Sequence, residues 1–533
     1  MSDSLNTNDR KNTCYELEQN SNSLIDIFKN IIHFIKQRKI FSVLVLLVSF
    51  LTYGCQLLYY RVSIDNDFLL NDHSYINFHI VIKRTTNVIL KYILDYERFN
   101  PYVTAFVTIF LIAIFAIVWS FVFNSAINRT KKNTSKYFWI LPILFISYPT
   151  LAEQFCFLMQ SVEVSIAITL CGLSIYCFNQ YILNNKFLKF YIFAIIFASL
   201  AFGSYQAIVG LFISGVLAYF IIWFFNKDQS KKYNYMKIIS LYLVGFIISL
   251  ILYYCFASII YLIFVGNGND YIDSQFKWGI WSFKKCIIDI IYYIKYMTFE
   301  KNIFSNILFY PISIAILAIN IIKLIQNKCS CLEFILIIFA TLAFIISPFI
   351  MPIALGSYIV PRIQLTMPFW LGFSLFYIIS SVNKKILLYS LLILSFFVAY
   401  RNIQKCVQLF YTGYIVYQED VQLINKISYD IDKKVGQNNP SMPVMYVGKV
   451  DARIPNSCVK GEVLGASEFD WYPEEILGVT SRVYCLAKSI GYNYLLPTNE
   501  QAIKAKELSE NMPVWPQEGS VDVRDGVVIV KLS

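Results

Sequence analysis

Charged residues are scarce in this sequence. Of its 533 residues, 15% are Asp, Glu, Lys or Arg, whereas 57% are hydrophobic. A soluble globular protein carries about 25% charged residues, so a soluble fold of this size would have too little polar surface to cover itself. Histidine is scarcer still: His33, His73 and His79 are the only three, and they form no clear metal-ligand set. We therefore predict no metal site and no cofactor, although nothing in the sequence excludes a divalent metal.

Nucleotide-binding motifs are also missing. The sequence has no Walker motif, no dinucleotide fingerprint and no G-x-S-x-G elbow, which argues against chemistry on a soluble nucleotide sugar. The net charge is +11, but the basic residues sit in short loops between apolar runs, and no basic stripe or stacking motif accompanies them. We therefore attribute the charge to membrane topology and predict no nucleic-acid partner.

Long apolar runs are what the sequence has instead. Runs such as Phe41–Leu51, Ala105–Phe123 and Ile238–Val265 approach or exceed the roughly 20 apolar residues that cross a bilayer. They predict an α-helical polytopic membrane protein with about eleven spans and no internal repeat. The third span and the fifth–sixth pair are short enough to be bent or re-entrant. The predicted spans are 40–60, 102–124, 137–151, 158–182, 187–204, 207–225, 237–265, 303–325, 333–350, 363–381 and 385–400.

Loop charges predict the orientation. With residues 1–39 in the cytoplasm, every short inner loop carries Lys or Arg, as inner loops should. The outer loops are then 61–101, 152–157, the turn near Tyr205, 266–302 and 351–362. Residues 40–400 form the transmembrane domain, and an odd number of spans places a C-terminal domain, 401–533, outside. Within residues 1–39, Leu24, Ile27, Phe28, Ile31 and Ile35 predict an amphipathic surface helix.

The C-terminal region regains Pro, Gly and balanced charge, and predicts a small α/β domain. Val444–Val447 is typical of a strand and Gln501–Glu510 of a helix. Val521–Leu532 is typical of a hairpin, because Asp525-Gly526 is a hairpin turn signal. Cys458 and Cys485 allow a disulfide outside the cytoplasm, and the sequence does not decide whether it forms.

The first outer loop contains two carboxylates, Asp65 and Asp67, just past the end of a span. On an extended segment, residues two apart face the same side. One carboxylate can then act as a general base while the other shapes its pKa or orients a substrate hydroxyl. The alternative is a solvated loop that happens to contain Asp and Asn, and on pattern alone this alternative is favoured.

Three basic residues are candidates for binding a phosphate. Lys83 and Arg84 precede an apolar stretch that predicts an interfacial helix, where Arg can bind a lipid phosphate through paired N–H donors. Arg362 opens the tenth span and is the only base in its outer loop, against the orientation rule. Holding an anionic lipid-linked substrate would explain it. Ordinary headgroup contact is the alternative for all three.

Polar residues at two tight outer turns are candidates for contacting substrate. Glu153 and Gln154 lie in one turn, and Tyr205 and Gln206 in the other. Tyr and Gln are frequent sugar-contacting types, through stacking and amide hydrogen bonds. Satisfaction of broken helix ends explains them equally well.

Taken together, these segments resemble the polytopic type II glucosyltransferases, which include phage-encoded serotype-converting enzymes that glucosylate O-antigen. The matching elements lie in order along nearly the whole chain, with Asn66 separating the acids and Lys83 where a Gly is familiar. They are Ile64–Asp67, Lys83-Arg84, Tyr148-Pro149 with Glu153–Phe155, Ser204–Gln206 and the tail Met512–Ser533.

The resemblance implies a membrane glycosyltransferase of the GT-C architecture in the bacterial inner membrane. Its donor would be undecaprenyl phosphate glucose, and its acceptor a lipid-linked O-antigen of the lipopolysaccharide. An Asp of the first outer loop, Asp65 or Asp67, would be the general base, and Arg362 and Arg84 would stabilise the leaving phosphate. The periplasmic C-terminal domain would position the acceptor.

Two other functions stay open. A transporter or flippase for lipid-linked saccharides would need repeats and ionisable residues within spans, and Glu163 lies within an apolar stretch. A non-catalytic assembly partner in polysaccharide export would not need acids just beyond the first span. The acceptor sugar, the linkage, the identity of the donor sugar and the oligomeric state are not specified by the sequence.

Overall fold

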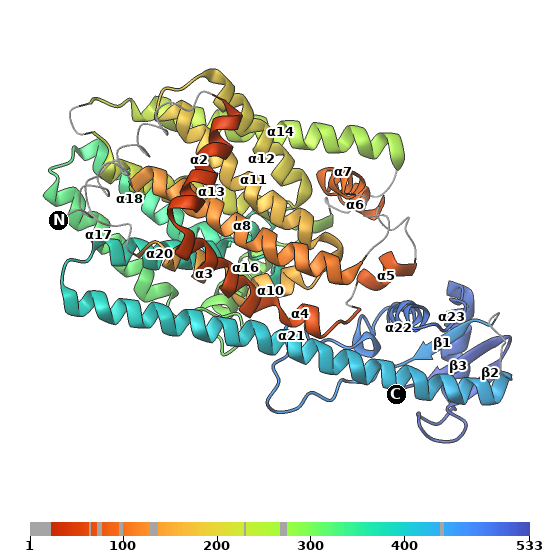
Figure 1. Ribbon diagram of the computed structural model, residues 1–533. Helices are drawn as coiled ribbons and strands as arrows, with labels where there is room; N and C mark the ends of the chain where they lie inside the picture. The colour runs from red at the N-terminus through yellow and green to blue at the C-terminus, as the bar shows by residue number, and fades with distance from the viewer. Residues whose placement is uncertain are drawn as a thin grey trace.

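A computed structural model describes most of the chain. The described residues are 23–62, 65–71, 77–94, 100–127, 137–228, 231–266, 274–436 and 442–533. Long helices run roughly side by side through one part of the molecule, and a small mixed domain lies at one end of this bundle (Figure 1).

The bundle is built from helices that fit a membrane. In the described residues, seven are long and apolar enough to cross it, and three shorter apolar helices lie among them. The prediction of a helical polytopic membrane protein with a small α/β domain is confirmed. The seven are α8 (Pro101–Ile127), α11 (Leu158–Ile182), α13 (Ile208–Asn226), α14 (Tyr235–Phe264), α17 (Phe309–Gln326), α18 (Cys331–Ile346) with its continuation to Leu355, and α21 (Lys385–Val435); the three are α3 (Lys39–Tyr53), α12 (Leu188–Ser204) and α20 (Thr366–Ser381).

The third predicted span is broken in two. Helix α9 (Ile140–Ile146) ends before Ser147, and α10 (Pro149–Phe155) starts with Pro149 in its first turn, where the missing N–H of proline is tolerated. The prediction of a bent span at 137–151 is confirmed. The fifth and sixth spans are instead continuous helices, α12 and α13, joined by a turn at Tyr205.

Helix α11 occupies the centre of the bundle. It packs against α8, α12 and α13. The Trp119 indole N–H of α8 donates to the carbonyl of Ile168 at 2.9 Å. Glycines make room for this ring: a Cβ at Gly172 or Gly215 would meet Trp119 at about 3.0 Å. Close approach without a side chain is the packing mode that helices favour in lipid.

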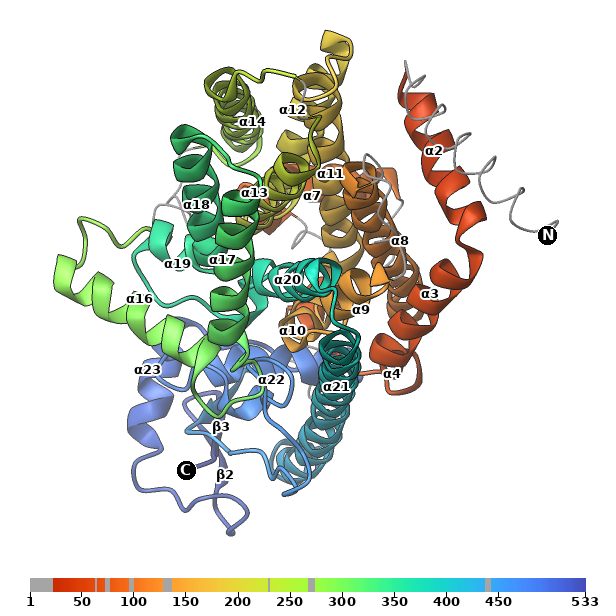
Figure 2. The same ribbon diagram turned by 90° about the vertical axis from the view of Figure 1, so that its left-hand side faces the viewer.

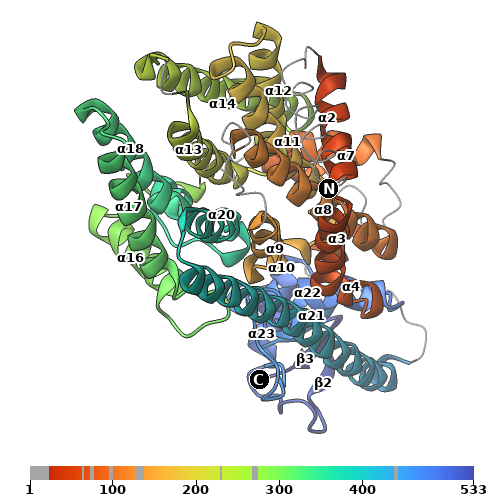
Figure 3. The same cartoon turned by 60° about the vertical axis from the view of Figure 1, so that its left-hand side comes forward.

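The N-terminal amphipathic helix is confirmed as α2 (Leu24–Gln37), which starts with a capping box between Ser23 and Asp26. Ile27 and Ile31 of the predicted apolar face are buried, together with Phe34, whereas Phe28 of that face is exposed. Helices α2 and α3 lie along one edge of the bundle, far from α16 to α18 (Figures 2 and 3).

One amphipathic helix was not predicted. Helix α16 (Phe283–Thr298) lies in the segment assigned to the outer loop 266–302 and packs against α19 (Ile350–Leu355). Its lysines and Asp289 interrupt the apolar run, so hydropathy alone did not reveal it.

The C-terminal domain is attached through α21, which runs without a break past residue 400 to Val435 (Figure 1). Its sheet has the order β1-β3-β2, with β1 (Val444–Val447) parallel to β3 (Val527–Lys531) and β2 (Val521–Arg524) antiparallel to it. The predicted strand, hairpin and helix (α23, Asn499–Leu508) are confirmed. Helix α22 (Gly478–Ser489) was not predicted. No disulfide joins Cys458 and Cys485.

Candidate functional site

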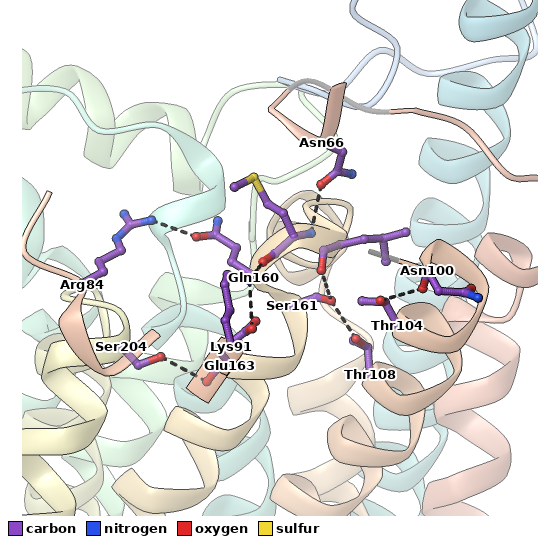
Figure 4. Close-up of polar contacts among 12 residues, drawn as sticks. Asn66, Arg84, Lys91, Asn100, Thr104, Thr108, Gln160, Ser161, Glu163 and Ser204 are labelled. Carbon is purple, nitrogen blue, oxygen red and sulfur yellow. Dashed lines mark hydrogen bonds and ion pairs between the residues drawn. The ribbon is translucent and has the colours of Figure 1, made fainter. Parts of the chain in front are cut away.

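A short stretch before and within the first turn of α11, Phe157–Gln160, lies where several predicted site residues meet. We call it the junction segment. The Met159 N–H donates to the Asn66 side chain at 2.9 Å, and Arg84 Nη1 donates to Gln160 Oε1 at 2.8 Å (Figure 4). The Arg362 guanidinium lies over the Phe157 ring at 5.3 Å. The junction segment therefore brings the acid-bearing loop and both predicted phosphate-binding arginines to one region.

On one side of the junction segment lies a group that we call the acid cluster: Asp65, Asp67, Glu468 and Arg482. Asp67 lies in the first turn of the short helix α5 (Asn66–Asn71), and α22 of the C-terminal domain packs against that helix. Arg482 Nη2 donates to Asp65 Oδ1 at 3.1 Å, and Arg482 Nη1 lies 3.7 Å from Asp67 Oδ1. The two acids found in the sequence are thus joined by an arginine 417 residues from Asp65.

The two carboxylates have different surroundings. The Asp67 side chain is fully buried, whereas that of Asp65 is 31% exposed and opens the cluster to solvent. Asp65 adopts a left-handed φ of 71°, which Asp tolerates better than most residues. This conformation turns the chain so that Asp67 enters a helix while Asp65 faces Arg482.

Burial and charge shift the acidities within the acid cluster. Burial raises the pKa of Asp67 to about 7, nearby Arg482 lowers it, and Asp65 raises it. Burial also raises the pKa of Glu468 well above its usual value, and the charge of Asp67 adds to this effect. An Asp with a pKa near neutrality suits proton transfer at physiological pH.

Arg362 also contacts the C-terminal domain. It forms an ion pair with Glu462, in the segment that precedes the acid-cluster residue Glu468. Arg362 is the only base in the predicted outer loop 351–362, and the ion pair with Glu462 gives one reason for its presence there. In this structure the Arg362 guanidinium group, which was predicted to bind a phosphate, binds the Glu462 carboxylate.

Glu153, on α10, binds the backbone of the same segment. Its carboxylate accepts N–H groups from Glu462 at 3.1 Å, Val463 at 2.9 Å and Leu464 at 3.3 Å. A Cβ at Gly461 would lie 1.8 Å from Glu153 Oε1, so only glycine permits this approach. The structure therefore places Glu153, predicted to contact substrate, as an anchor of the C-terminal domain.

On the other side of the junction segment lies a second group, which we call the basic cluster: Lys83, Arg84, Lys91, Glu163 and Gln206. Lys83 and Arg84 lie between helices α6 (Phe78–Val81) and α7 (Thr85–Ile93), and Lys91 lies on α7, which was predicted as an interfacial helix. Arg84 Nε donates to Gln206 Oε1 at 3.1 Å.

Two tyrosines complete this side of the site. The Arg84 guanidinium lies 4.5 Å from the centroid of the Tyr205 ring. Lys83 Nζ contacts Tyr254, with its hydroxyl at 3.3 Å and its ring centroid at 4.5 Å. Aromatic rings and neutral amides thus help to fix the positions of both cations.

Glu163 does not stand alone within its apolar helix. Lys91 Nζ lies 2.9 Å from Glu163 Oε1, and both side chains are at most 2% exposed (Figure 4). Lys91 also donates to the carbonyl of Met159 in the junction segment. A buried charge needs such a partner, because an unpaired one is strongly destabilising.

The structure thus gathers the predicted site residues into connected groups. Asp65 and Asp67 meet in the acid cluster, and Lys83, Arg84, Tyr205 and Gln206 meet at the basic cluster. Gln154 is fully buried on α10, and its amide has no hydrogen-bond partner among the described residues. Sequence reasoning missed four polar residues, because none belongs to a motif and all depend on the packing of distant segments. They are Gln160, Glu462, Glu468 and Arg482.

A model of the family "Glucosyl transferase GtrII" matches residues 82–379, which is more than half of the chain. The chain belongs to this family of glucosyltransferases and is therefore a membrane-bound glycosyltransferase. No curated protein and no solved structure gives a significant match. The matched range includes the basic cluster and Arg362, whereas the acid cluster lies outside it, on Asp65, Asp67 and the C-terminal domain.

Proposed function

We propose that this enzyme transfers glucose from undecaprenyl phosphate glucose to a hydroxyl of a lipid-linked O-antigen or related surface polysaccharide. The reaction takes place on the periplasmic face of the bacterial inner membrane, with residues 1–39 in the cytoplasm and 401–533 in the periplasm. The observation that carries the proposal is that the acid pair and the predicted phosphate-binding arginines meet around one junction segment.

Asp67 is the general base in this proposal. The acceptor oxygen attacks the anomeric carbon of the donor and passes its proton to the Asp67 carboxylate. The bond between that carbon and the phosphate oxygen breaks, with inversion, and undecaprenyl phosphate leaves. Burial supports this role because it raises the pKa of Asp67 to about 7, close to the pH at which the proton must be taken up. Asp65 orients Arg482 beside it.

Arg84 and Lys83 hold the donor phosphate, where negative charge grows as the bond breaks. Arg362 joins them by exchanging its Glu462 partner for phosphate, since a guanidinium group binds carboxylate and phosphate through the same paired donors. The contacts of the basic cluster support this role: Gln160 and Gln206 orient the Arg84 guanidinium group, and Tyr254 holds Lys83 beside it.

Transport of a lipid-linked saccharide is less well supported. Glu163 was the residue that pointed to it, and Glu163 is paired with Lys91. The buried ion pair accounts for a charged residue at this position, so Glu163 does not require an ion or proton pathway.

The proposal is tested by mass spectrometry of surface polysaccharide from cells with and without the protein. A hexose increment should appear with the wild type and vanish with Asp67→Asn. Asp470→Asn is the matched control, because Asp470 lies near Glu468 but forms ion pairs with Lys449 and Lys460 away from the acid cluster. Absence of any mass change with the wild-type protein, correctly inserted, would contradict the proposal.

A further inference from the structure

The C-terminal side of the acid cluster contains buried polar atoms that the transfer step does not use. Glu468 is 6% exposed, and its Oε2 atom has no hydrogen-bond partner among the described residues. Within the same described set, the Trp471 indole N–H and Arg482 Nη1 also make no hydrogen bond. Arg482 Nη1 has its ion pair with Asp67 at 3.7 Å, which is too long for a hydrogen bond. Buried polar groups normally make hydrogen bonds, so three that make none near one another call for a further partner.

These atoms belong to one neighbourhood. The Arg482 guanidinium lies 5.9 Å from the Trp471 ring centroid and 4.7 Å from that of Phe68. Glu468 and Trp471 are three residues apart, at either end of a single 3-10 turn and its cap. The ring of Trp471 also contacts that of Tyr472, which is 53% exposed, so an aromatic pair that reaches solvent lies next to the buried groups.

The chemistry of the missing partner follows from the atoms that need it. Glu468 Oε2 accepts a hydrogen bond when the carboxyl is ionised and can donate one when it is protonated, whereas the Trp471 N–H and Arg482 Nη1 need acceptors. An anion fits poorly beside three carboxylates held by one arginine, and a simple cation would leave both N–H groups unpaired. Neutral hydroxyl groups donate and accept at once, and a sugar ring stacks on aromatic faces.

We propose that Glu468, Trp471 and Arg482 form a saccharide subsite that binds the hydroxyl groups of the acceptor next to Asp67. The inference rests on the proposed function for the identity of the ligand as an acceptor. It goes beyond that function because it assigns acceptor recognition to three particular side chains of the C-terminal domain.

The test is a binding measurement on the full-length protein in lipid nanodiscs. The probe is delipidated surface polysaccharide, released by mild acid from cells of the same strain that lack this protein, and binding is followed by equilibrium dialysis. Glu468→Gln and Trp471→Phe should each weaken binding about tenfold, as expected when a buried hydrogen bond is lost. The phenylalanine keeps the ring and removes only the N–H, so stacking is retained.

Asp470→Asn is the control and should bind as the wild type does, and thermal unfolding should be the same for all three variants. Wild-type affinity in both Glu468→Gln and Trp471→Phe would overturn the inference, as would an equal loss in Asp470→Asn or no binding by the wild type. The two proposals can fail separately. Polysaccharide binding that depends on Glu468, without hexose transfer by the wild type, would remove the proposed function and leave the subsite.

Discussion

The acid cluster and the basic cluster are linked through the junction segment and differ in three ways. The acid cluster consists of three carboxylates and one arginine, whereas the basic cluster contains three bases and one carboxylate, of which Lys91 and Glu163 form an ion pair. The acid cluster is completed by the C-terminal domain, and the basic cluster by helices within the bundle. The acids are held by charge, and two of the bases by tyrosine rings and amides.

This difference indicates a division of labour. A site that takes up a proton needs a carboxylate whose pKa is raised by burial and by other acids. A site that holds a leaving phosphate needs cations placed where negative charge develops. The junction segment, which contacts both clusters, sets the distance between them. The following variants test the division, beginning with the largest expected effect.

Asp67→Asn should reduce the rate of hexose transfer by about 10²- to 10⁴-fold, the range for loss of a general base. The asparagine keeps the size of the side chain and cannot take the proton. The measurement is transfer of labelled hexose in purified membranes, at equal protein levels. Asp65→Asn should have a smaller effect, because Asp65 acts through Arg482. A larger loss in Asp65→Asn than in Asp67→Asn would assign the base to Asp65.

Arg482→Gln should lower the rate of transfer by up to about a hundredfold, since misplacing a reacting group costs this much. It should also change the pH dependence. Arg482 lowers the pKa of Asp67, so its removal raises that pKa further, and the acidic limb of the pH–rate profile should move to higher pH. Arg482→Lys, which keeps the positive charge, should leave the acidic limb close to its wild-type position. A rate that falls with no movement of the acidic limb would show that Arg482 is only structural.

Arg84→Gln should raise the KM for the lipid-linked donor about tenfold and leave the KM for the acceptor unchanged, because a charge-assisted bond to phosphate is lost. Steady-state kinetics with each substrate varied in turn makes the measurement. Lys285→Gln provides a comparison, since Lys285 contacts Trp281 near the start of α16, away from both clusters. Equal changes in both KM values for Arg84→Gln would contradict the assignment of donor binding to the basic cluster alone.

Glu153→Gln should have the smallest effect on chemistry and act on stability instead. The amide can accept through one oxygen only, so bonds to the backbone at 462–464 are lost. We expect a loss of about 1.5–3 kcal/mol, the range for hydrogen bonds to a charged group. Thermal unfolding and the rate of proteolytic cleavage within 442–533 measure it. Asp451→Asn, an exposed acid, should leave both unchanged.

The sequence contained enough information for the bundle but not for the site as a whole. Runs such as Ala105–Phe123 predict spans because hydropathy is a local property, and the Asp525-Gly526 turn predicts its hairpin for the same reason. Asp65 and Asp67 were visible because acids are costly next to a span.

Arg482 was not visible, because it lies in a polar helix with no motif and reaches Asp65 only through packing of the C-terminal domain. The role of Glu153 likewise depends on a backbone segment about 310 residues away. Such contacts between distant segments carry no signal in a single sequence.

The central claim is that the first outer loop and the C-terminal domain form one catalytic unit through Asp67 and Arg482. A double-mutant cycle with Asp67→Asn and Arg482→Gln, read out as the rate of hexose transfer, tests it most directly. Residues that act together give non-additive effects, so the double variant should be scarcely slower than Asp67→Asn alone, with a coupling free energy of about 0.5–3 kcal/mol. Strictly additive losses would contradict the account.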